Sequence, residues 1–358
     1  MKKNIIVCLV SDQTIHNVLF IKEFLQKNDE ILLITTDRME AKEEFIKRAL
    51  KLPNKFHRIV VNEHNDNSIQ DQIKLFDFSW YTRSLVNITG GTKLMSIEIF
   101  DYFKNSVNSS IYYITLNNTY KKIFPIESNN LQKFKSKVTI SEYFNAYGFD
   151  SLPSALSEVP KEYTYDFFRW FVSSKTSEEH KVVSELQKYR SQKKILMDQV
   201  IGLKELLINC QFPFQNAYLT KKDVKYLTGE WLEEFIYYKI QDSQIVSLDE
   251  IVCGISRKNM SSSNEFDVVF LYDNELCIVE CKTYIKSNEK KSLTGDTIYK
   301  LDSTLKDFGL RAKSYIVTLN KREEINESDL KRAQQYGIKI LTLEDLINEN
   351  FVENNFMK

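Results

Sequence analysis

The first 150 residues alternate short apolar runs with longer segments whose apolar positions recur three and four residues apart. Short apolar runs rich in β-branched residues predict buried strands, and the helical spacing predicts helices with one buried face. The predicted strands comprise residues 4–10, 31–35, 58–62, 84–88 and 111–115. The predicted helices between them comprise residues 15–27, 38–50, 68–78 and 92–104.

Strands that are apolar throughout and separated by helices are typical of a parallel sheet covered by helices on both faces. The first 150 residues are therefore predicted to form an α/β, Rossmann-like domain with strand order 3-2-1-4-5. Residues 120–126 and 137–140 are predicted to append an antiparallel edge to this sheet.

The middle of the chain is strongly charged and carries one apolar stripe, which comprises Val183, Leu186, Ile195, Val200, Leu203 and Leu207. One or two connecting helices that also serve subunit contacts, or a solvated helical linker, would explain this stripe. From residue 216 onward, helices are predicted at 229–240, 296–308 and 327–336, and strands at 265–271, 276–282, 314–318 and 339–341. The chain is therefore predicted to comprise a first domain (1–150), a helical linker (151–215) and a second α/β domain (216–358).

The composition fits a soluble protein of two domains, with 358 residues, 42% hydrophobic and 27% charged. Lys plus Arg and Asp plus Glu each number 49, so the formal net charge is zero. Because proteins that bind nucleic acid constitutively usually have a basic excess, any such contact is expected to be local or conditional.

Five cysteines without CxxC spacing indicate reduced thiols, and hence a cytoplasmic location, rather than disulfides or a zinc site. The apolar stretch near the N-terminus is short and is followed by Ser11 and Asp12, so we interpret it as a buried strand rather than a signal peptide. No apolar run has the length of a membrane helix, so no membrane partner is expected.

The clearest chemical signal lies in the two neighbouring strands predicted after residue 264. Asp273 and Asn274 between two β-rich runs predict a hairpin turn. With Leu271 facing Leu276, the register places Asp267 opposite Glu280, with Cβ atoms about 5 Å apart. Lys282 follows Glu280 by two residues and therefore shares its face.

Two carboxylates and an ammonium group inside otherwise apolar strands need a compensating partner, because buried unpaired charge is costly. A hard divalent cation, Mg²⁺ or Mn²⁺, would supply it. Lys282 would then orient or deprotonate a water, or stabilise the charge developing on a phosphate. The alternative is a cross-strand salt bridge on a solvated sheet face.

The helix before this hairpin begins with the sequence GEWLEE, which contains Glu233 and Glu234. A helix with G-x-W-L-E, a strand with an acid and then E-x-K resembles the PD-(D/E)xK nuclease superfamily, which has a restriction-endonuclease-like fold. The resemblance implies Glu233, Asp267 and Glu280 as metal ligands and Lys282 as the catalytic lysine. Phe266 stands where the family usually has Pro, and the adjacent Glu234 leaves the helix ligand open.

Two polar loops follow the first and fourth predicted strands: Ser11-Asp12-Gln13-Thr14 and Thr89-Gly90-Gly91-Thr92-Lys93. These strands are neighbours in the predicted order, so the loops are expected to meet at the switch point where ligands bind. Gly90 and Gly91 would let the backbone approach a ligand, and the helix N-terminus with Lys93 would favour a phosphate. The alternative is simple helix capping.

This pair of loops resembles the CARF domain, the sensor of cyclic oligoadenylates in type III CRISPR defence. The resemblance implies a ligand site that comprises Ser11, Gln13, Thr14, Thr89, Gly90, Gly91, Thr92 and Lys93. Thr36 and Met39, at the end of the second predicted strand, are expected to flank an adenine or to cap the next helix.

A CARF domain followed by a PD-(D/E)xK domain resembles the CRISPR ancillary nucleases of the Card and Can type over nearly the whole chain. The resemblance implies a homodimer that binds cyclic tetra-adenylate, with cyclic hexa-adenylate as the alternative. The activated enzyme would cleave single-stranded DNA or RNA or nick supercoiled duplex DNA, and the loops at 256–264 and 284–294 are expected to contact phosphate. A catalytically silent nucleotide-binding regulator and a constitutive restriction- or repair-type nuclease stay open.

Overall fold

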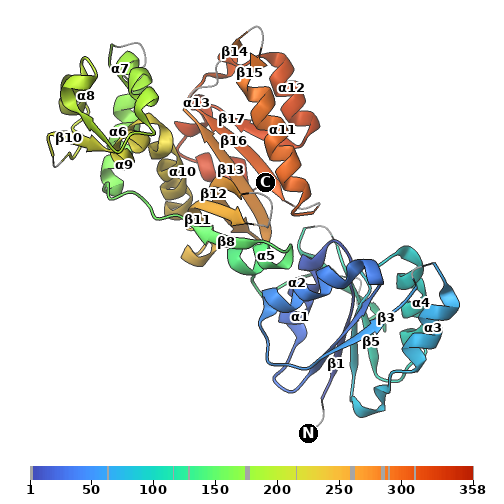
Figure 1. Cartoon of the computed structure of the whole chain (residues 1–358). Helices are drawn as coiled ribbons and strands as arrows, with labels where there is room; N and C mark the ends of the chain where they lie inside the picture. The colour runs from blue at the N-terminus through green and yellow to red at the C-terminus, as the bar shows by residue number, and fades with distance from the viewer. Residues whose placement is uncertain are drawn as a thin grey trace.

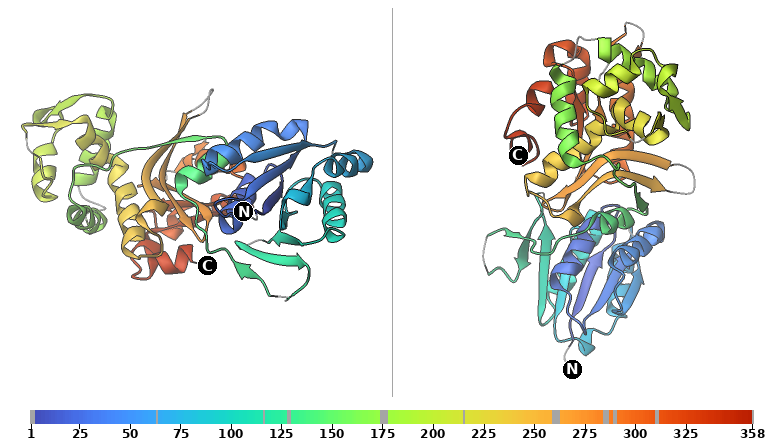
Figure 2. Two further views of the ribbon diagram at one scale, coloured as in Figure 1. Left: turned by 90° about the horizontal axis from the view of Figure 1, so that it is seen from below. Right: turned by 90° about the vertical axis from the view of Figure 1, so that its left-hand side faces the viewer.

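The computed structural model describes residues 3–62, 64–115, 117–127, 130–173, 178–214, 216–258, 263–283, 287–288, 291–309 and 312–357. These residues form two α/β bodies, one around a seven-stranded sheet and one around a six-stranded sheet (Figure 1). A smaller helical unit flanks the second body on the side away from the first (Figure 2). The predicted mixed α/β class is confirmed.

The N-terminal sheet has the strand order β3-β2-β1-β4-β5-β6-β7. Its first five strands are parallel, namely β1 (Ile5–Leu9), β2 (Glu30–Thr35), β3 (Phe56–Val60), β4 (Ser84–Asn87) and β5 (Ser109–Ile114). Two antiparallel strands, β6 (Thr119–Phe124) and β7 (Gln132–Lys133), extend the edge beyond β5. The predicted order 3-2-1-4-5 is therefore confirmed.

Successive side chains of the central strand β1 enter two different cores. Ile6 packs with the helices of one face, α1 (Thr14–Phe24), α2 (Glu40–Leu50) and α5 (Ile140–Ala146). Val7 packs with the helices of the other face, α3 (Asp66–Lys74) and α4 (Lys93–Lys104). Because both faces are covered, every position of β1 is apolar, as in other parallel sheets.

The strand predicted at residues 137–140 is wrong, because Ile140 begins helix α5. The hydroxyl of Thr139 accepts a hydrogen bond from the Glu142 N–H, and the Glu142 carboxylate accepts one from the Thr139 N–H. This reciprocal capping box satisfies two N–H groups that a helix start otherwise leaves unpaired. The antiparallel edge instead ends with the short strand β7.

The C-terminal sheet has the order β17-β16-β13-β12-β11-β8. Its strands are β8 (Asp150–Pro153), β11 (Ile251–Lys258), β12 (Ser263–Tyr272), β13 (Glu275–Lys282), β16 (Lys313–Thr318) and β17 (Ile338–Leu341). Helix α10 (Trp231–Asp242) contributes Trp231 to the core on one face, together with the last helix, α14 (Phe351–Phe356). Helices α11 (Leu293–Lys306) and α12 (Glu327–Gln335) cover the other face.

Strands β12 and β13 form the predicted hairpin, and Tyr272 pairs with Glu275 across its end. The two-residue loop consists of Asp273 and Asn274, whose φ angles are 51° and 62°. Two consecutive left-handed residues are characteristic of a type I′ turn, whose twist matches that of antiparallel strands. The turn therefore sets the predicted register, in which Leu271 pairs with Leu276.

Residues 161–225 form the helical unit beside this sheet, with helices α6 (Lys161–Ser173), α7 (Glu178–Leu186), α8 (Leu203–Asn209) and α9 (Lys221–Lys225). Strands β9 (Lys194–Leu196) and β10 (Tyr218–Thr220) pair between them. All six residues of the predicted stripe are buried in one core with α10, which does not fit a solvated linker. The boundaries 1–150, 151–215 and 216–358 stay predictions.

Helix α5 joins the two sheets through an aromatic contact. Phe144 packs against Phe308, which follows α11, and against Phe266 in β12. A single apolar cluster therefore extends from α1 and α2 to the nearer face of the C-terminal sheet. The two bodies are held together by a shared core as well as by the chain that connects them.

Candidate active site

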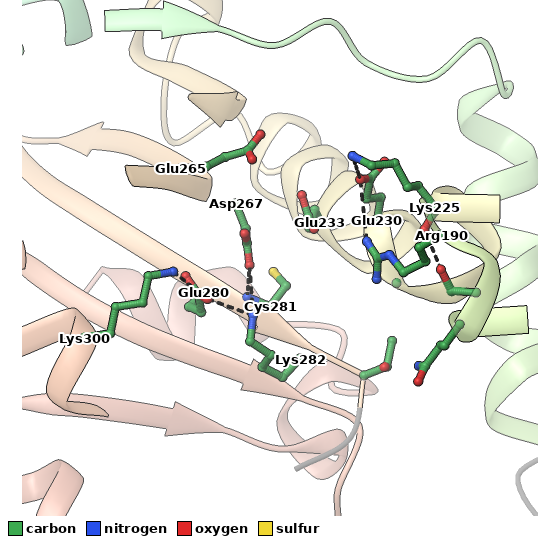
Figure 3. A pocket seen from close by; sticks show the side chains of 14 residues that line it. Arg190, Lys225, Glu230, Glu233, Glu265, Asp267, Glu280, Cys281, Lys282 and Lys300 are labelled. Atoms are coloured by element: carbon green, nitrogen blue, oxygen red, sulfur yellow. Dashed lines mark hydrogen bonds and ion pairs between the residues drawn. The ribbon is translucent and has the colours of Figure 1, made fainter. Parts of the chain in front are cut away.

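A pocket of about 500 Å³ lies between α10, α11 and one end of the β12–β13 hairpin. All four residues that the sequence pointed to, Glu233, Asp267, Glu280 and Lys282, line it. Figure 3 shows their side chains gathered around one space, although they come from a helix and two strands. Much of the predicted phosphate-contacting loops, at 259–262, 284–286 and 289–290, lies outside the described residues.

Asp267 sits where the backbone pairing of the hairpin stops. The pairing of β12 with β13 ends at Val268 and Val279, one pair before Asp267 would face Glu280. The Cys281 N–H, next to that end, donates to Asp267 Oδ2 over 2.7 Å. The side chain of Asp267 thus replaces a ladder hydrogen bond, and this contact orients its carboxylate.

Glu280 lies between two ammonium groups. Its side chain is only 4% exposed, and its Oε1 lies 2.7 Å from Lys282 Nζ and 3.7 Å from Lys300 Nζ. Lys282 Nζ also lies 3.9 Å from Asp267 Oδ2. Lys300 comes from α11 and was not predicted as a site residue, because no local pattern connects that helix to the hairpin.

The structure distinguishes the two adjacent glutamates of α10. Glu234 is buried and accepts hydrogen bonds from Ser157, at 2.6 Å from the backbone N–H and 2.9 Å from the hydroxyl. Glu233 lines the pocket with Asp267. Glu234 therefore anchors the segment before α6, and Glu233 is the helix carboxylate that faces the hairpin.

The buried carboxylates repel one another. Burial, and to a lesser extent the negative charge of Asp267, raises the pKa of Glu233 to about 9. Burial, and to a lesser extent the negative charge of Glu280, raises the pKa of Asp267 to about 7, although the positive charge of Lys282 lowers it. The ionised forms are thus unfavourable without further positive charge.

The donor set fits Mg²⁺ or Mn²⁺, which prefer carboxylate oxygens and retain several waters. Among the described residues, no three or more Asp, Glu, His or Cys side chains are arranged as a ready cation site. The oxygens that could hold a cation in this pocket are those of Asp267 and Glu280, with Glu233 lining the same pocket. Because burial and mutual repulsion raise the pKa of Glu233 and Asp267, the positive charge of a cation would favour their ionised forms.

The predicted sensor loops meet at the carboxyl ends of β1 and β4, which are parallel neighbours in the N-terminal sheet. A Cβ at Gly90 would lie 2.2 Å from the carbonyl oxygen of Leu9 and 3.2 Å from the Ser11 hydroxyl, so only glycine fits. Gly91 has a φ of 71°, which also favours glycine. The close approach of the two loops thus depends on these glycines.

Several predicted ligand residues have structural hydrogen bonds. The Thr14 hydroxyl donates to the Ala146 carbonyl, and Thr89 Oγ1 accepts from the Ile114 N–H over 2.7 Å. Thr92 caps α4 by accepting from the Met95 N–H over 3.2 Å. Met39 is buried in the core beside α2. The capping alternative therefore holds for Thr92 at least.

The other predicted ligand residues place polar side chains at or near the carboxyl ends of these strands. Lys93 is exposed at the first turn of α4, and Ser11 is partly exposed. Gln13 packs against Gly309 of the C-terminal body, where a Cβ would lie 2.4 Å from its Oε1. Thr36 Oγ1 is buried without a hydrogen-bond partner among the described residues and lines a pocket of about 420 Å³. An orphaned hydroxyl of this kind indicates a place for a ligand or water.

Two protein families match the chain, one in each body. The Card1 CARF domain matches residues 5–143, and the Card1-like endonuclease domain matches residues 220–356. The chain belongs to the Card1-type CARF-domain endonucleases. No curated protein sequence matches at a significant level.

Solved structures share the fold of this CARF endonuclease over most of its length. Can2 from Sulfobacillus thermosulfidooxidans, in complex with cyclic tetra-adenylate, is 23% identical with a TM-score of 0.74, and 94% of this chain and 95% of Can2 are covered. Protein VC1899 from Vibrio cholerae is 20% identical with a TM-score of 0.76, covering 96% and 95%. A type III CRISPR defence DNA nuclease activated by cyclic oligoadenylate is 13% identical with a TM-score of 0.53, covering 89% of this chain and 45% of its own.

Within the described part of the chain, no helix combines the length and the apolar character that crossing a membrane requires.

Glu233→Gln should flatten the pH dependence of stability of the metal-free protein. A carboxyl whose folded pKa is raised to about 9 stabilises the fold fully below its ordinary pKa and loses that contribution as pH rises toward 9. The parent's thermal midpoint, measured in EDTA between pH 5 and 9, should therefore fall more steeply than the variant's. The exposed Glu353→Gln is the control and should keep the parent slope. Parallel curves for parent and Glu233→Gln would contradict the prediction.

Proposed function

We propose that this CARF endonuclease is a Mg²⁺- or Mn²⁺-dependent phosphodiesterase that a cyclic oligoadenylate switches on in type III CRISPR defence. The observation that carries the proposal is the Asp267–Glu280–Lys282 cluster, which lies in a pocket of the same chain as a CARF domain. Cleavage of single-stranded DNA or RNA, or nicking of supercoiled DNA, is the proposed reaction. The five cysteines are all buried and free, in keeping with a reducing cytoplasm.

In the proposed reaction, Asp267 and Glu280 would hold the cation, with Glu233 as the third carboxylate. The cation would supply Lewis-acid stabilisation of the charge that develops on the reacting phosphate. Lys282 is the residue of this chain that would help to stabilise that charge. Although burial opposes its charged form, Asp267 and Glu280 outweigh burial and raise the pKa of Lys282. In the metal-free chain the two carboxylates thus favour the charged form of Lys282, which suits a cationic donor to the phosphate.

Cyclic tetra-adenylate is the proposed activator, with cyclic hexa-adenylate as the alternative. Gly90 and Gly91 allow close backbone approach, Lys93 offers a cation at the start of α4, and Thr36 leaves a hydroxyl to be satisfied. The similar fold of Can2 was solved with this ligand. A homodimer in which two sensor domains share one ring would match the twofold symmetry of the ligand.

Two other functions are weaker. A catalytically silent nucleotide-binding regulator would not need to retain two buried carboxylates and a lysine at the cost of their mutual repulsion. A constitutive restriction- or repair-type nuclease would not need a CARF domain. Activation and cleavage by one chain explain both features.

Glu280→Gln and Lys282→Gln should each lower the activated cleavage rate by about 100-fold or more, because each removes charge complementary to the cation or the reacting phosphate. The assay combines Mn²⁺ and cyclic tetra-adenylate with labelled DNA, RNA and supercoiled plasmid, and EDTA should abolish cleavage. Lys306→Gln, exposed on α11 outside the pocket, is the control and should cleave at the parent rate. Parent-like cleavage by Glu280→Gln would disprove the site.

Lys93→Met should raise the cyclic tetra-adenylate concentration needed for half-maximal cleavage by about tenfold, since it removes a charge-assisted contact to phosphate. The rate at saturating activator should stay near that of the parent. The matched control is Lys104→Met at the other end of α4, which should leave the activation curve in place. Cleavage by the parent that is indifferent to every cyclic oligoadenylate would refute the sensor role.

A further inference from the structure

The active-site pocket has a cationic wall that comes from outside the nuclease motif. Arg190 follows the short helix η3 (Gln187–Tyr189), and Lys225 ends α9. Both line the pocket on the side opposite Lys300, as Figure 3 shows. The carboxylate cluster therefore lies between two sets of cationic side chains.

One carboxylate holds both cations of this wall. Glu230 Oε1 lies 2.7 Å from Lys225 Nζ and 3.7 Å from Arg190 Nη2. Arg190 and Lys225 remain 41% and 40% exposed. A single carboxylate neutralises only one of two cations, and ion pairs at such exposure contribute little, so both can exchange partners readily.

The backbone is shaped to present these groups together. A kinked turn, η5 (Tyr226–Glu230), joins α9 to α10, and its backbone is non-helical at Gly229. Across this kink, Lys225 Nζ donates to Glu230 Oε1 over 2.7 Å. Arg190 lies over this turn, with Nη1 3.5 Å from where a Cβ of Gly229 would be.

We propose that Arg190 and Lys225 bind backbone phosphates of the nucleic-acid strand beside the phosphate that is cleaved. This inference rests on the proposed nuclease function. A guanidinium fork and an ammonium group both suit phosphate oxygens, and Glu230 keeps them in place when no strand is bound. Contacts to phosphate position a strand without reading its bases, so the wall favours binding with little sequence preference. The helical unit at residues 161–225 thereby becomes part of the substrate site.

Arg190→Gln and Lys225→Gln should each raise the KM for cleavage about tenfold while kcat stays within about twofold. Strand binding is measured by fluorescence anisotropy in the Glu280→Gln background, which does not cleave. For each variant, the slope of log affinity against log salt concentration should fall by about one, which corresponds to one lost phosphate contact. Lys222→Gln on the same helix, outside this pocket, is the matched control and should match the parent in both measurements. Thermal midpoints check that each variant is folded.

Parent-like KM and salt dependence in both variants would overturn the inference. A fall in kcat with unchanged KM would also overturn it, since that would indicate a role in the chemical step or in folding. Because binding is measured in a chain that does not cleave, an inactive parent would count against the nuclease proposal and not against this wall.

A separate set of contacts links the sensor loops to the active-site hairpin. Asn274, in the hairpin turn, accepts a hydrogen bond from the Val138 N–H over 2.9 Å and donates one to the Ser136 carbonyl over 3.0 Å. The Ser136 and Lys135 N–H groups in turn donate to one carboxylate oxygen of Glu23, over 2.8 and 3.0 Å. Glu23 lies in the last turn of α1, the helix that begins directly after the first sensor loop.

A second contact reaches the other side of the pocket. Gln13, in that first loop, packs against Gly309, which follows the end of α11. Lys300 of α11 lies 3.7 Å from Glu280. A shift of the first sensor loop would therefore act on both elements that carry the site. It would act on the hairpin through α1 and Asn274, and on α11 through Gln13.

We infer that the Asn274 contact transmits activation from the sensor to the hairpin, and this inference also rests on the proposed function. Five residue pairs connect the turn at Asn274 with the end of the hairpin that carries Asp267 and Glu280. Movement at Asn274 would therefore be carried along the paired strands toward these carboxylates. The side chain of Asn274 makes both hydrogen bonds, to the backbone groups of Val138 and Ser136, so one substitution can remove the contact.

Asn274→Gly should lower the ratio of activated to unactivated cleavage by about tenfold, within the usual range of coupling between sites. Glycine accommodates the left-handed φ of 62°, so the turn is kept while both hydrogen bonds are lost. Affinity for cyclic tetra-adenylate, measured by calorimetry, should stay within about twofold of the parent. The control is Asp273→Gly, which loses only the exposed ion pair with Lys133 and should keep the ratio.

An unchanged activation ratio in Asn274→Gly would overturn this inference. If Asn274→Gly lowers the thermal midpoint, Asn274→Asp serves instead, because it keeps the acceptor for Val138 and loses the donor to Ser136; a parent-like ratio there would overturn the inference equally. A parent chain that no cyclic oligoadenylate activates would show that the proposed function itself has failed.

Discussion

The repulsion among the buried carboxylates at the end of the β12–β13 hairpin is the constraint on which the site depends. Glu233 and Asp267 are held close by a helix and a strand whose neighbouring residues, Trp231 and Phe266, are anchored in the two apolar cores. The packing of these neighbours fixes the helix and the strand that carry the two carboxylates. The apolar surroundings that raise their pKa values therefore also hold them in position for a cation.

The hairpin explains why so much of this site was predictable from the sequence. Strand periodicity is two, and a two-residue turn fixes which residues face each other. Whether the loop is Asp273-Asn274 alone or all of residues 272–275, the sequence predicts that Leu271 pairs with Leu276, and the structure confirms this pairing. The prediction that Asp267 lies directly opposite Glu280 was less complete, because the ladder ends one pair earlier and Asp267 binds the Cys281 N–H instead. Local pattern determines register, but it does not determine where pairing stops.

Features that depend on distant segments were not predictable in this way. Glu233 and Glu234 are adjacent on one helix, and only the hydrogen bonds from Ser157 distinguish them. Lys300 and Lys225 lie on helices and Arg190 directly follows one, and no local pattern in these segments connects them to the hairpin. The predicted strand at 137–140 failed because the Thr139–Glu142 capping box outweighed the local apolar run.

The charges around the pocket suggest how a chain with zero net charge can handle nucleic acid. Four cationic side chains and five carboxylates line the pocket, which therefore has a formal charge of −1 when all are ionised. One divalent cation, which would favour ionisation of all five carboxylates, would make the formal charge +1, so the pocket would attract a phosphodiester once the cation is bound. Glu230 pairs with Arg190 and Lys225 until a phosphate replaces it. Cationic side chains gathered in this pocket thus provide local affinity for a strand in a chain whose net charge is zero.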